Sequence, residues 1–443
     1  MQTHPTVFEY GHLCADKQLA LLKGYVFIPD QDFTYLEQRC LTEDGSDFNQ
    51  LLQPRCIQGC RLLQVKSYAG VIFVPSGQHI EVLPKTGRKS ESLVDARKTL
   101  LVMLQALGEF RHIELESTRI ETLSMPLLEV FIIHFLESVN HVVKRGLRRD
   151  YVAVEDNLLV KKGKLNVAKQ IKHNLTQQQR FYCEFDEYLN DNPVNRLLKS
   201  ALIKVRSYCT SHHNHKFSNE LLFALDDVPA SNNVKHDFNQ VQLSRGMAHY
   251  RPALAWAKLI LGGFSPMSMK GDNDSPTLLF PMEVVFEAYV AQVLHKQLPS
   301  HLQLRTQIAS RRLAVHVKES SSKELFVLKP DLLIEHNTTP VYVLDTKWKL
   351  VDGTDASNKY GLSQADFYQM FAYGHKYLAG EGELFLIYPA TDSFSQPIDG
   401  YFQLAEKLRL RVVPFVIDTG GKSHLIYDFS TLRTSHSFRL NIT

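Results

Sequence analysis

A chain of 443 residues exceeds the usual size of one domain, so we expect two or three hydrophobic cores. Hydrophobic residues make up 44% and charged residues 22%, which excludes a disordered or fibrous protein, and the formal charge of +3 is too small to indicate a nucleic-acid partner by itself. The sequence shows neither an apolar stretch long enough to span a membrane nor a signal peptide, so we expect a cytoplasmic protein without membrane contact.

The first 95 residues predict a β-rich N-terminal module. Two of its apolar runs flank Ser76-Gly77, which is typical of a β-hairpin turn. Its Cys56 and Cys60 lack the usual CxxC spacing, so we expect buried free thiols, with a zinc site that includes Cys40 or a histidine as the alternative. Strands are expected at residues 24–29, 62–66, 70–75 and 79–83.

Residues 96–270 predict a mainly helical region. Apolar residues recur at helical spacing, most clearly over Leu127–Val139, and Asn192 with the following proline predicts the start of another helix. The basic cluster Lys144–Arg149 is interpreted as a solvated helix end, with DNA contact as the alternative. The polar segment 268–275 predicts a linker and a domain boundary.

Residues 276–443 predict a mixed sheet flanked by helices, which makes the whole chain an α/β and α+β multidomain protein. Helices are expected at residues 281–298 and 363–378. Strands are expected at residues 302–308, 313–317, 325–334, 341–348, 383–387, 408–416 and 425–428.

Two acidic residues and a lysine in this last region predict a catalytic site. Asp345 and Lys347 lie two positions apart at the end of an apolar strand, so their side chains share one face, whereas Thr346 points to the other. Asp331 lies across a short turn, and hairpin pairing is expected to bring it close to Asp345. Two carboxylates with room for water make an open site of the kind Mg²⁺ prefers, and an adjacent lysine offsets charge that develops on phosphorus.

Residues on two helices are expected to complete this site. Glu287 supplies a further carboxylate, with Glu283 one turn away as its competitor, and Gln369 and Tyr373 share a helical face from which they bind phosphate or position the lysine. The alternative is that Asp345 and Lys347 form an exposed ion pair without catalytic function. The expected catalytic residues are Asp331, Asp345, Lys347, Glu287, Gln369 and Tyr373, and the expected Mg²⁺ ligands are Asp331, Asp345, Thr346 and Glu287.

The order Pro-Asp, apolar strand, Asp-x-Lys is typical of PD-(D/E)xK nucleases, and further blocks give the chain a wider resemblance. It resembles the McrC family, the nuclease subunit of modified-cytosine-dependent McrBC restriction systems. The blocks that carry this resemblance are residues 68–72, 80–85, 144–151, 162–165 and 192–196. No landmark of the family is found before Cys60.

The resemblance implies a Mg²⁺-dependent DNA endonuclease subunit of an anti-phage restriction complex, with a restriction-endonuclease-like C-terminal domain. It also implies a McrB-like AAA+ GTPase ring as partner, which recognises and translocates methylated double-stranded DNA, while residues 1 to about 270 of this chain bind the ring and stimulate it. Consistent with this division, the sequence has no G-x-x-x-x-G-K-[ST] phosphate loop. Candidate ring contacts are the Ser76-Gly77 hairpin and Lys144–Arg149. The alternatives are a stand-alone nuclease acting on DNA or RNA and a non-catalytic activator of the motor.

Overall fold

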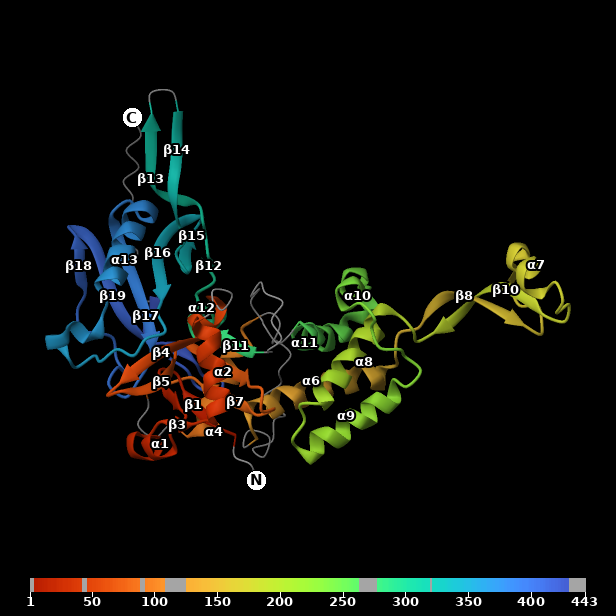
Figure 1. Ribbon diagram of the computed structural model, residues 1–443. Coiled ribbons are helices and arrows are strands. Elements are labelled where there is room, and N and C mark those ends of the chain that lie inside the picture. Colours follow the sequence, from red (N-terminus) through yellow and green to blue (C-terminus); the bar gives the residue numbers. More distant parts are fainter. Residues whose placement is uncertain are drawn as a thin grey trace, which may run out of the picture. The chain divides into compact units, whose positions relative to one another are not determined.

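The computed structural model describes residues 4–41, 46–87, 92–107, 125–262, 277–318 and 321–429 of a mixed α/β protein (Figure 1). The chain forms two compact units, one of residues 1–124 together with 267–443 and the other of residues 125–266. No helix in the described ranges has both the length and the apolar character needed to cross a bilayer. The division of the chain into three functional regions stays a prediction.

The N-terminal part of the first unit contains two four-stranded sheets, ordered β1-β7-β6-β11 and β3-β2-β5-β4. Strand β11 follows the helical region in sequence, so early and late segments of the chain share one sheet. The strands are β1 (Thr6–Phe8), β2 (His12–Cys14), β3 (Val26–Phe27), β4 (Leu52–Ile57), β5 (Cys60–Val65), β6 (Tyr68–Phe73), β7 (His79–Leu83) and β11 (Thr277–Pro281). The helices are α1 (Lys17–Lys23), α2 (Asp30–Leu41), α3 (Ser46–Leu51) and α4 (Leu93–Leu104).

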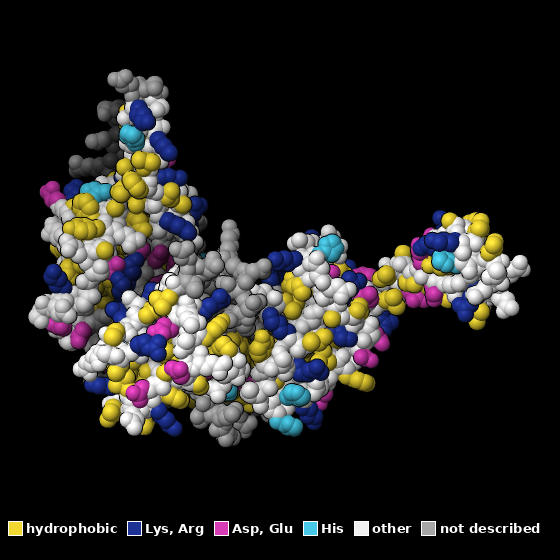
Figure 2. Space-filling view, viewed as in Figure 1, with side chains coloured by type: hydrophobic (Ala, Val, Ile, Leu, Met, Phe, Trp, Pro, Cys, Tyr) yellow, Lys and Arg dark blue, Asp and Glu magenta, His cyan; other side chains and the backbone are white. Residues whose placement is uncertain are grey.

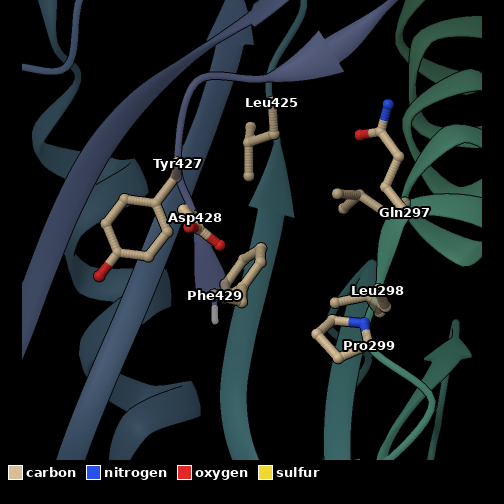
Figure 3. A pocket seen from close by; sticks show the side chains of 8 residues that line it. Gln297, Leu298, Pro299, Leu425, Tyr427, Asp428 and Phe429 are labelled. Atoms are coloured by element: carbon tan, nitrogen blue, oxygen red, sulfur yellow. The ribbon is translucent and has the colours of Figure 1, made fainter. Parts of the chain in front are cut away.

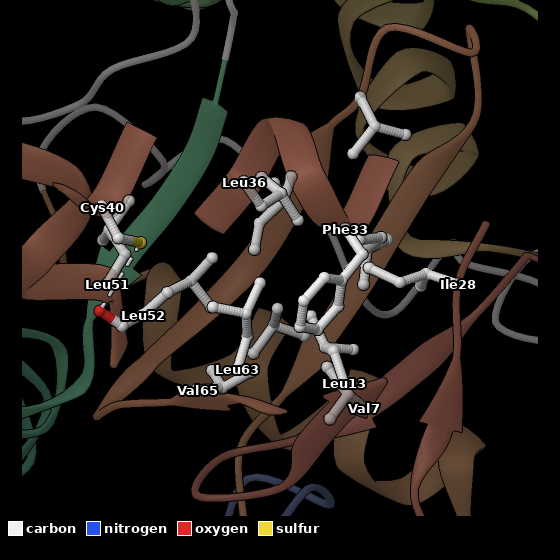
Figure 4. Close-up of a cluster of buried hydrophobic side chains, with 14 of the residues drawn as sticks. Val7, Leu13, Ile28, Phe33, Leu36, Cys40, Leu51, Leu52, Leu63 and Val65 are labelled. Carbon is white, nitrogen blue, oxygen red and sulfur yellow. Dashed lines mark hydrogen bonds between the residues drawn. The ribbon is translucent and has the colours of Figure 1, made fainter. Parts of the chain in front are cut away.

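One hydrophobic core holds these sheets and α2 together (Figure 4). Phe33 and Leu36 of α2 are fully buried and belong to the same cluster as Leu13 and Leu63 of the strands beneath. Burying such a side chain stabilises the fold by about 1.5 to 3 kcal/mol. All six cysteines lie in described residues and are free thiols. The burial expected for Cys56 and Cys60 is wrong, because Cys56 is exposed and Cys60 is only half-buried.

The second unit packs its helices on α6 and α8, and the apolar face of α6 was expected from the sequence. Asn192 caps α8 by accepting a hydrogen bond from the backbone N–H of Asn195, and Pro193 opens that helix, which confirms the predicted start. The unit also contains a three-stranded sheet, ordered β8-β10-β9, with α7 packed against β10 (Figure 1). Its elements are α6 (Leu127–Arg145), β8 (Asp150–Leu158), β9 (Lys164–Leu165), α7 (Val167–Asn174), β10 (Phe181–Leu189), α8 (Pro193–Arg206), α9 (His212–Ala224), α10 (Val234–Gln240), η2 (Arg245–Tyr250) and α11 (Arg251–Leu261).

Lys144 and Arg145 form the last turn of α6, where cations favour the helix dipole. Beyond the helix, Arg148 pairs with Asp150 and Arg149 donates to the side chain of Asn190. The local structure is therefore the solvated helix end expected from the sequence, and contact with DNA or a ring stays a prediction.

The C-terminal part of the first unit is a mixed sheet ordered β12-β15-β16-β17-β19-β18, with β20 also pairing with β19. Strands β16, β17 and β19 run parallel, and the other pairings are antiparallel. The hairpin β13-β14 forms a separate two-stranded sheet. The strands are β12 (Leu302–Thr306), β13 (Arg311–Lys318), β14 (Ser321–Leu328), β15 (Leu332–His336), β16 (Thr339–Thr346), β17 (Glu381–Pro389), β18 (Phe402–Ala405), β19 (Lys407–Val416) and β20 (His424–Leu425). The helical elements are α12 (Met282–Gln297), η3 (Ala356–Gly361) and α13 (Gln364–Tyr377).

Three details of the sequence-based expectation need correction or fall outside the described chain. The single strand expected over residues 325–334 is wrong, because Pro330 has no backbone N–H and the chain there leaves the hairpin and enters the main sheet as β15. The strand expected at residues 24–29 is shorter, because Gly24 adopts a left-handed conformation that ends α1. The expected linker at residues 268–275 lies outside the described residues.

We predict that Gly70→Ala strongly destabilises the first unit. Gly70 has a φ of +140°, and a Cβ there would lie 1.9 Å from the carbonyl oxygen of Leu278 on the paired strand β11. We expect a loss of about 2 kcal/mol or more in the free energy of unfolding. Urea denaturation followed by Trp348 fluorescence in a Trp256→Phe background measures this unit, because these are the two tryptophans of the chain.

Gly77→Ala is the matched control. Gly77 also has a positive φ, +80°, but an added Cβ meets no atom within 4 Å, so the substitution costs only backbone strain of about 1 kcal/mol. Equal losses for the two variants would contradict the close approach of β6 and β11.

Candidate active site

Asp345 and Lys347 lie at the carboxyl end of β16, a strand in the interior of the main sheet. Strand β16 pairs antiparallel with β15 on one side and parallel with β17 on the other, and its last four residues, Val343–Thr346, are buried. The strand ends at Thr346, and the backbone N–H of Lys347 still donates to Ile387 of β17. Asp345 is 0% exposed and the Lys347 side chain 19%, so the pair is not the exposed surface ion pair of the alternative interpretation.

Asp331 joins this pair from the neighbouring strand. The register pairs Leu332 of β15 with Leu344 of β16, which places Asp331 beside Asp345, as the hairpin pairing predicted. The Oδ2 atom of Asp331 accepts hydrogen bonds from the backbone N–H and the hydroxyl of Thr346, at 2.7 and 2.8 Å. Thr346 therefore fixes the orientation of the Asp331 carboxylate.

The surrounding charges shift the proton affinities of Asp345 and Lys347. Burial, together with the nearby charge of Asp331, raises the pKa of Asp345 from 3.8 to about 7, although Lys347 acts in the opposite direction. Burial disfavours the charged form of Lys347, but the adjacent Asp345 outweighs it and the pKa of the ammonium is raised. Lys347 thus stays charged and forms an ion pair with Asp345.

Helix α13 holds the lysine from the other side. Lys347 Nζ donates to Gln369 Oε1 at 3.2 Å, and Gln369 Nε2 donates to Tyr373 OH at 2.8 Å. Tyr373 in turn donates to the backbone carbonyl of Lys329, two residues before Asp331, at 3.0 Å. In this geometry Gln369 and Tyr373 connect the lysine to the strand that carries Asp331.

Glu287 approaches the same site from α12. Burial and the charge of Asp331 raise the pKa of Glu287, and its carboxylate accepts a hydrogen bond from Gln307 Nε2 at 2.9 Å. Glu283, which the sequence offered as the alternative carboxylate, is exposed, and its charge acts on Glu9 of the N-terminal part by helping to raise the pKa of that residue. The structure thus brings all the expected site residues to one region, with Glu287 at its edge, and their roles stay predictions.

Several polar residues near the site were not expected. Asp366 of α13 raises the pKa of Asp345 and accepts hydrogen bonds from Lys349 and from Tyr388 of β17, at 3.1 and 3.2 Å. Its position three residues before Gln369, on the same helical face, was the available signal. Gln307 had no such signal, because it lies between strands with a φ of +50°.

Trp348, next to the lysine, makes a contact that the sequence did not indicate. Its indole N–H donates to both carboxylate oxygens of Glu9, at 3.1 and 2.9 Å, and its ring lies 5.3 Å from that of Phe286 in α12. Burial raises the pKa of Glu9 to about 8. The N-terminal part of the chain therefore touches the strand end that carries the site.

The donor set fits Mg²⁺ better than a softer metal. Within the described ranges no group of three His, Cys, Asp or Glu side chains is arranged to hold a metal ion, so a ready-made cage is absent there. Mg²⁺ usually keeps several water ligands and needs only one or two carboxylates, which Asp331 and Asp345 would supply. The buried Oδ2 of Asp345 contacts the ammonium of Lys347, so this carboxylate already lies beside a positive charge at the place where the ion would bind.

A separate pocket lies between the end of α12 and the segment that follows β20 (Figure 3). It shares no residue with the carboxylate and lysine site, and its lining is about equally polar and apolar. The lining residues are Leu294, Gln297, Leu298, Pro299, Leu425, Tyr427, Asp428 and Phe429.

Fold and site together define a mixed α/β protein with a buried carboxylate and lysine site where a central strand of its main sheet ends. The chain belongs to the family described as the McrBC 5-methylcytosine restriction system component, whose model matches residues 63–389. No curated protein matches the chain.

Two solved structures are similar to the chain. One is the refined half-complex from the tetradecameric assembly of Thermococcus gammatolerans McrB AAA+ hexamers with bound McrC, at 19% identity and a TM-score of 0.66, covering 95% of this chain and 96% of that one. The other is the cryo-EM structure of the Thermococcus gammatolerans McrBC complex, at 23% identity and a TM-score of 0.46, covering 67% and 89%. The first likeness shows a shared fold, whereas the TM-score of the second is too low to support an argument.

We predict that Asp345→Asn makes the first unit more stable relative to wild type as pH rises from about 4 to 7. With a pKa of about 7 in the folded chain against 3.8 unfolded, wild-type Asp345 retains a proton on folding, so its contribution to stability falls across this window. The expected slope is roughly 1.4 kcal/mol per pH unit at most. Urea denaturation at several pH values, with EDTA present, measures the difference.

Asp352→Asn serves as the control of opposite sign. Hydrogen bonds from the side chain and backbone of Thr354 lower the pKa of the partly exposed Asp352, so this variant loses rather than gains stability relative to wild type as pH rises. Parallel stability curves for Asp345→Asn and wild type would show that Asp345 is not buried as described.

Proposed function

We propose that this chain is the Mg²⁺-dependent DNA endonuclease subunit of a modification-dependent restriction system that acts against phage in the cytoplasm. In this proposal residues 276–443 form a PD-(D/E)xK nuclease domain. The convergence of Asp331, Asp345 and Lys347 at the end of β16 is the observation that carries it. Membership of the McrBC family supports duplex DNA, methylated at cytosine, as the substrate.

Asp331 and Asp345 would hold Mg²⁺ directly through their carboxylates. Glu287, the third expected ligand, is not arranged with them to hold an ion in the described residues, so it would act through a water ligand of the ion. Thr346 would add its main-chain oxygen, because its hydroxyl already donates to Asp331. When bound, the ion polarises the phosphodiester and lowers the pKa of the attacking water. A charge of +2 beside Asp345 also favours its ionised form, which opposes the effect of burial on its pKa.

Lys347 acts on the substrate side of the same site. Its ammonium is charged and partly exposed, so it can orient the attacking water and offset the negative charge that grows on the phosphate oxygens. Gln369 accepts one of its three N–H donors, which limits the positions of Nζ. Tyr373 keeps Gln369 in place through its hydroxyl.

The proposed partner is an AAA+ GTPase ring of the McrB type. The Thermococcus gammatolerans assembly that shares this chain's fold joins McrB AAA+ hexamers with bound McrC, and nearly the whole of both matched chains aligns. A separate motor also agrees with the absence of a phosphate-binding loop from this sequence. Residues 1 to about 270 are the proposed ring-binding part.

We predict that Asp331→Ala, Asp345→Ala and Lys347→Ala each reduce cleavage of methylated duplex DNA by about a thousandfold. Each variant removes a metal ligand or the charge that stabilises the transition state. Cleavage by the assembled complex with Mg²⁺ and GTP is the measurement, and co-purification with the GTPase confirms that assembly is intact. Wild-type cleavage by any one variant would remove that residue from the mechanism.

Lys407→Ala is the matched control, because Lys407 forms an exposed ion pair with Glu381 on the same sheet. An exposed pair of this kind contributes roughly 1 kcal/mol or less, so cleavage should stay at the wild-type rate.

We further predict that the wild-type chain cuts methylated duplex only with its GTPase partner and GTP. Digestion by the purified chain with Mg²⁺ alone would instead favour a stand-alone nuclease. If Asp345→Ala cells still restrict phage as wild type does, the chain is a non-catalytic activator of the motor. Measuring plasmid cleavage in vitro and phage plating on cells that carry each variant separates the three.

A further inference from the structure

The β13-β14 hairpin stands out because it is exposed along most of its length. Figure 1 shows the two strands running away from the main sheet of the first unit. Apolar β-branched side chains are exposed on it, including Val315 at 53% and Val317 at 74%. A two-stranded ribbon without a covering layer is only marginally stable by itself, so an extended ribbon suggests a binding role.

Charge is concentrated on this hairpin. Residues 311–329 contain five Lys and Arg against two Glu, a net charge of +3. The whole chain also carries +3, so the remaining residues sum to zero. Figure 2 shows dark-blue side chains along the hairpin together with its exposed apolar groups.

The cations are placed for contact with an external anion. His316 pairs directly with Lys323 across the two strands, and Lys318 is two residues from His316, so all three lie on one face of the ribbon. Arg312 pairs with Glu324, whereas Arg311, Lys318 and Lys323 are exposed and form no ion pair with a described residue.

The base of the hairpin is fixed to the proposed active site by α13. Tyr377 OH donates to the carbonyl oxygens of Ile308, three residues before β13 begins, and of Leu328, the last residue of β14, at 3.0 and 2.9 Å. Tyr377 is one turn beyond Tyr373 and two turns beyond Gln369, which holds Lys347. The ribbon therefore extends from the same supports that position the site.

We propose that the β13-β14 hairpin is a DNA-binding ribbon that lies in the major groove of the duplex beside the scissile phosphate. Its eight-residue strands span about 27 Å, and the major groove, about 12 Å wide, admits a two-stranded ribbon that the minor groove does not. Arg311, Lys318 and Lys323 contact phosphates, which makes the binding insensitive to base sequence. The inference rests on the proposed function for the identity of its ligand.

Equilibrium binding of a fluorescent 30-base-pair duplex by the full chain in EDTA, as a function of salt, tests this proposal. The ribbon variant combines Arg311→Ala, Lys318→Ala and Lys323→Ala. Losing three phosphate contacts should lower the slope of log K against log salt by roughly 2 to 3 and weaken binding on the order of a hundredfold at 0.1 M salt. A second variant, Arg311→Lys with Lys318→Arg and Lys323→Arg, keeps the charge and should bind like wild type.

The charge-matched control combines Lys17→Ala, Lys23→Ala and Lys422→Ala, three exposed lysines outside the hairpin. This control should bind DNA like wild type. Equal losses in ribbon and control variants, an unchanged ribbon variant, or a wild-type chain without salt-dependent binding would each overturn the proposal. A ribbon variant that alters the sedimenting mass of the chain but not its DNA affinity would identify the hairpin as a protein interface instead.

Because the binding test omits metal, it separates this inference from the proposed function. Salt-dependent binding through the ribbon without any cleavage by the complex would support the DNA-binding role of the ribbon and contradict the proposed nuclease function. If cleavage depends on Asp345 but the ribbon variant binds DNA normally, the nuclease function is supported and the DNA-binding role of the ribbon is contradicted.

Discussion

A buried carboxylate beside a charged lysine at the end of an interior strand is the constraint on which the rest of this structure depends. Removing Asp345 from water is costly, and its ion pair with Lys347 offsets only part of that cost. The part of this desolvation cost that the ion pair does not offset raises the pKa of Asp345. Perturbed groups of this kind cluster at functional sites, where burial and neighbouring charges are arranged to shift pKa values.

The supports around this pair come from distant parts of the sequence. Thr346 orients Asp331, Gln369 holds the lysine, and the Glu9 carboxylate accepts the indole N–H of Trp348. Residues nearly 340 positions apart thus meet at one strand end. This contact gives the N-terminal part of the chain a physical route to the site, which a nuclease under the control of a motor would need.

The sequence predicted the site better than the surrounding architecture. The sequence could predict the convergence of Asp331, Asp345 and Lys347, because strand alternation and pairing across a short turn are set by neighbouring residues. The break at Pro330 between two sheets, the pairing of β11 with β6, and the short edge strand β18 were not recovered, because nonlocal pairing decides them. Glu9 was missed for the same reason, since nothing near it in sequence indicates a partner in the last third.

Locating a bound divalent ion tests the central claim most directly. In crystals of the wild-type chain grown with Mn²⁺, anomalous scattering should place an ion about 2.1 Å from carboxylate oxygens of both Asp331 and Asp345. The same experiment with Asp345→Asn should show no ion there. An ion found only elsewhere, or none in wild type at saturating Mn²⁺, would contradict the account.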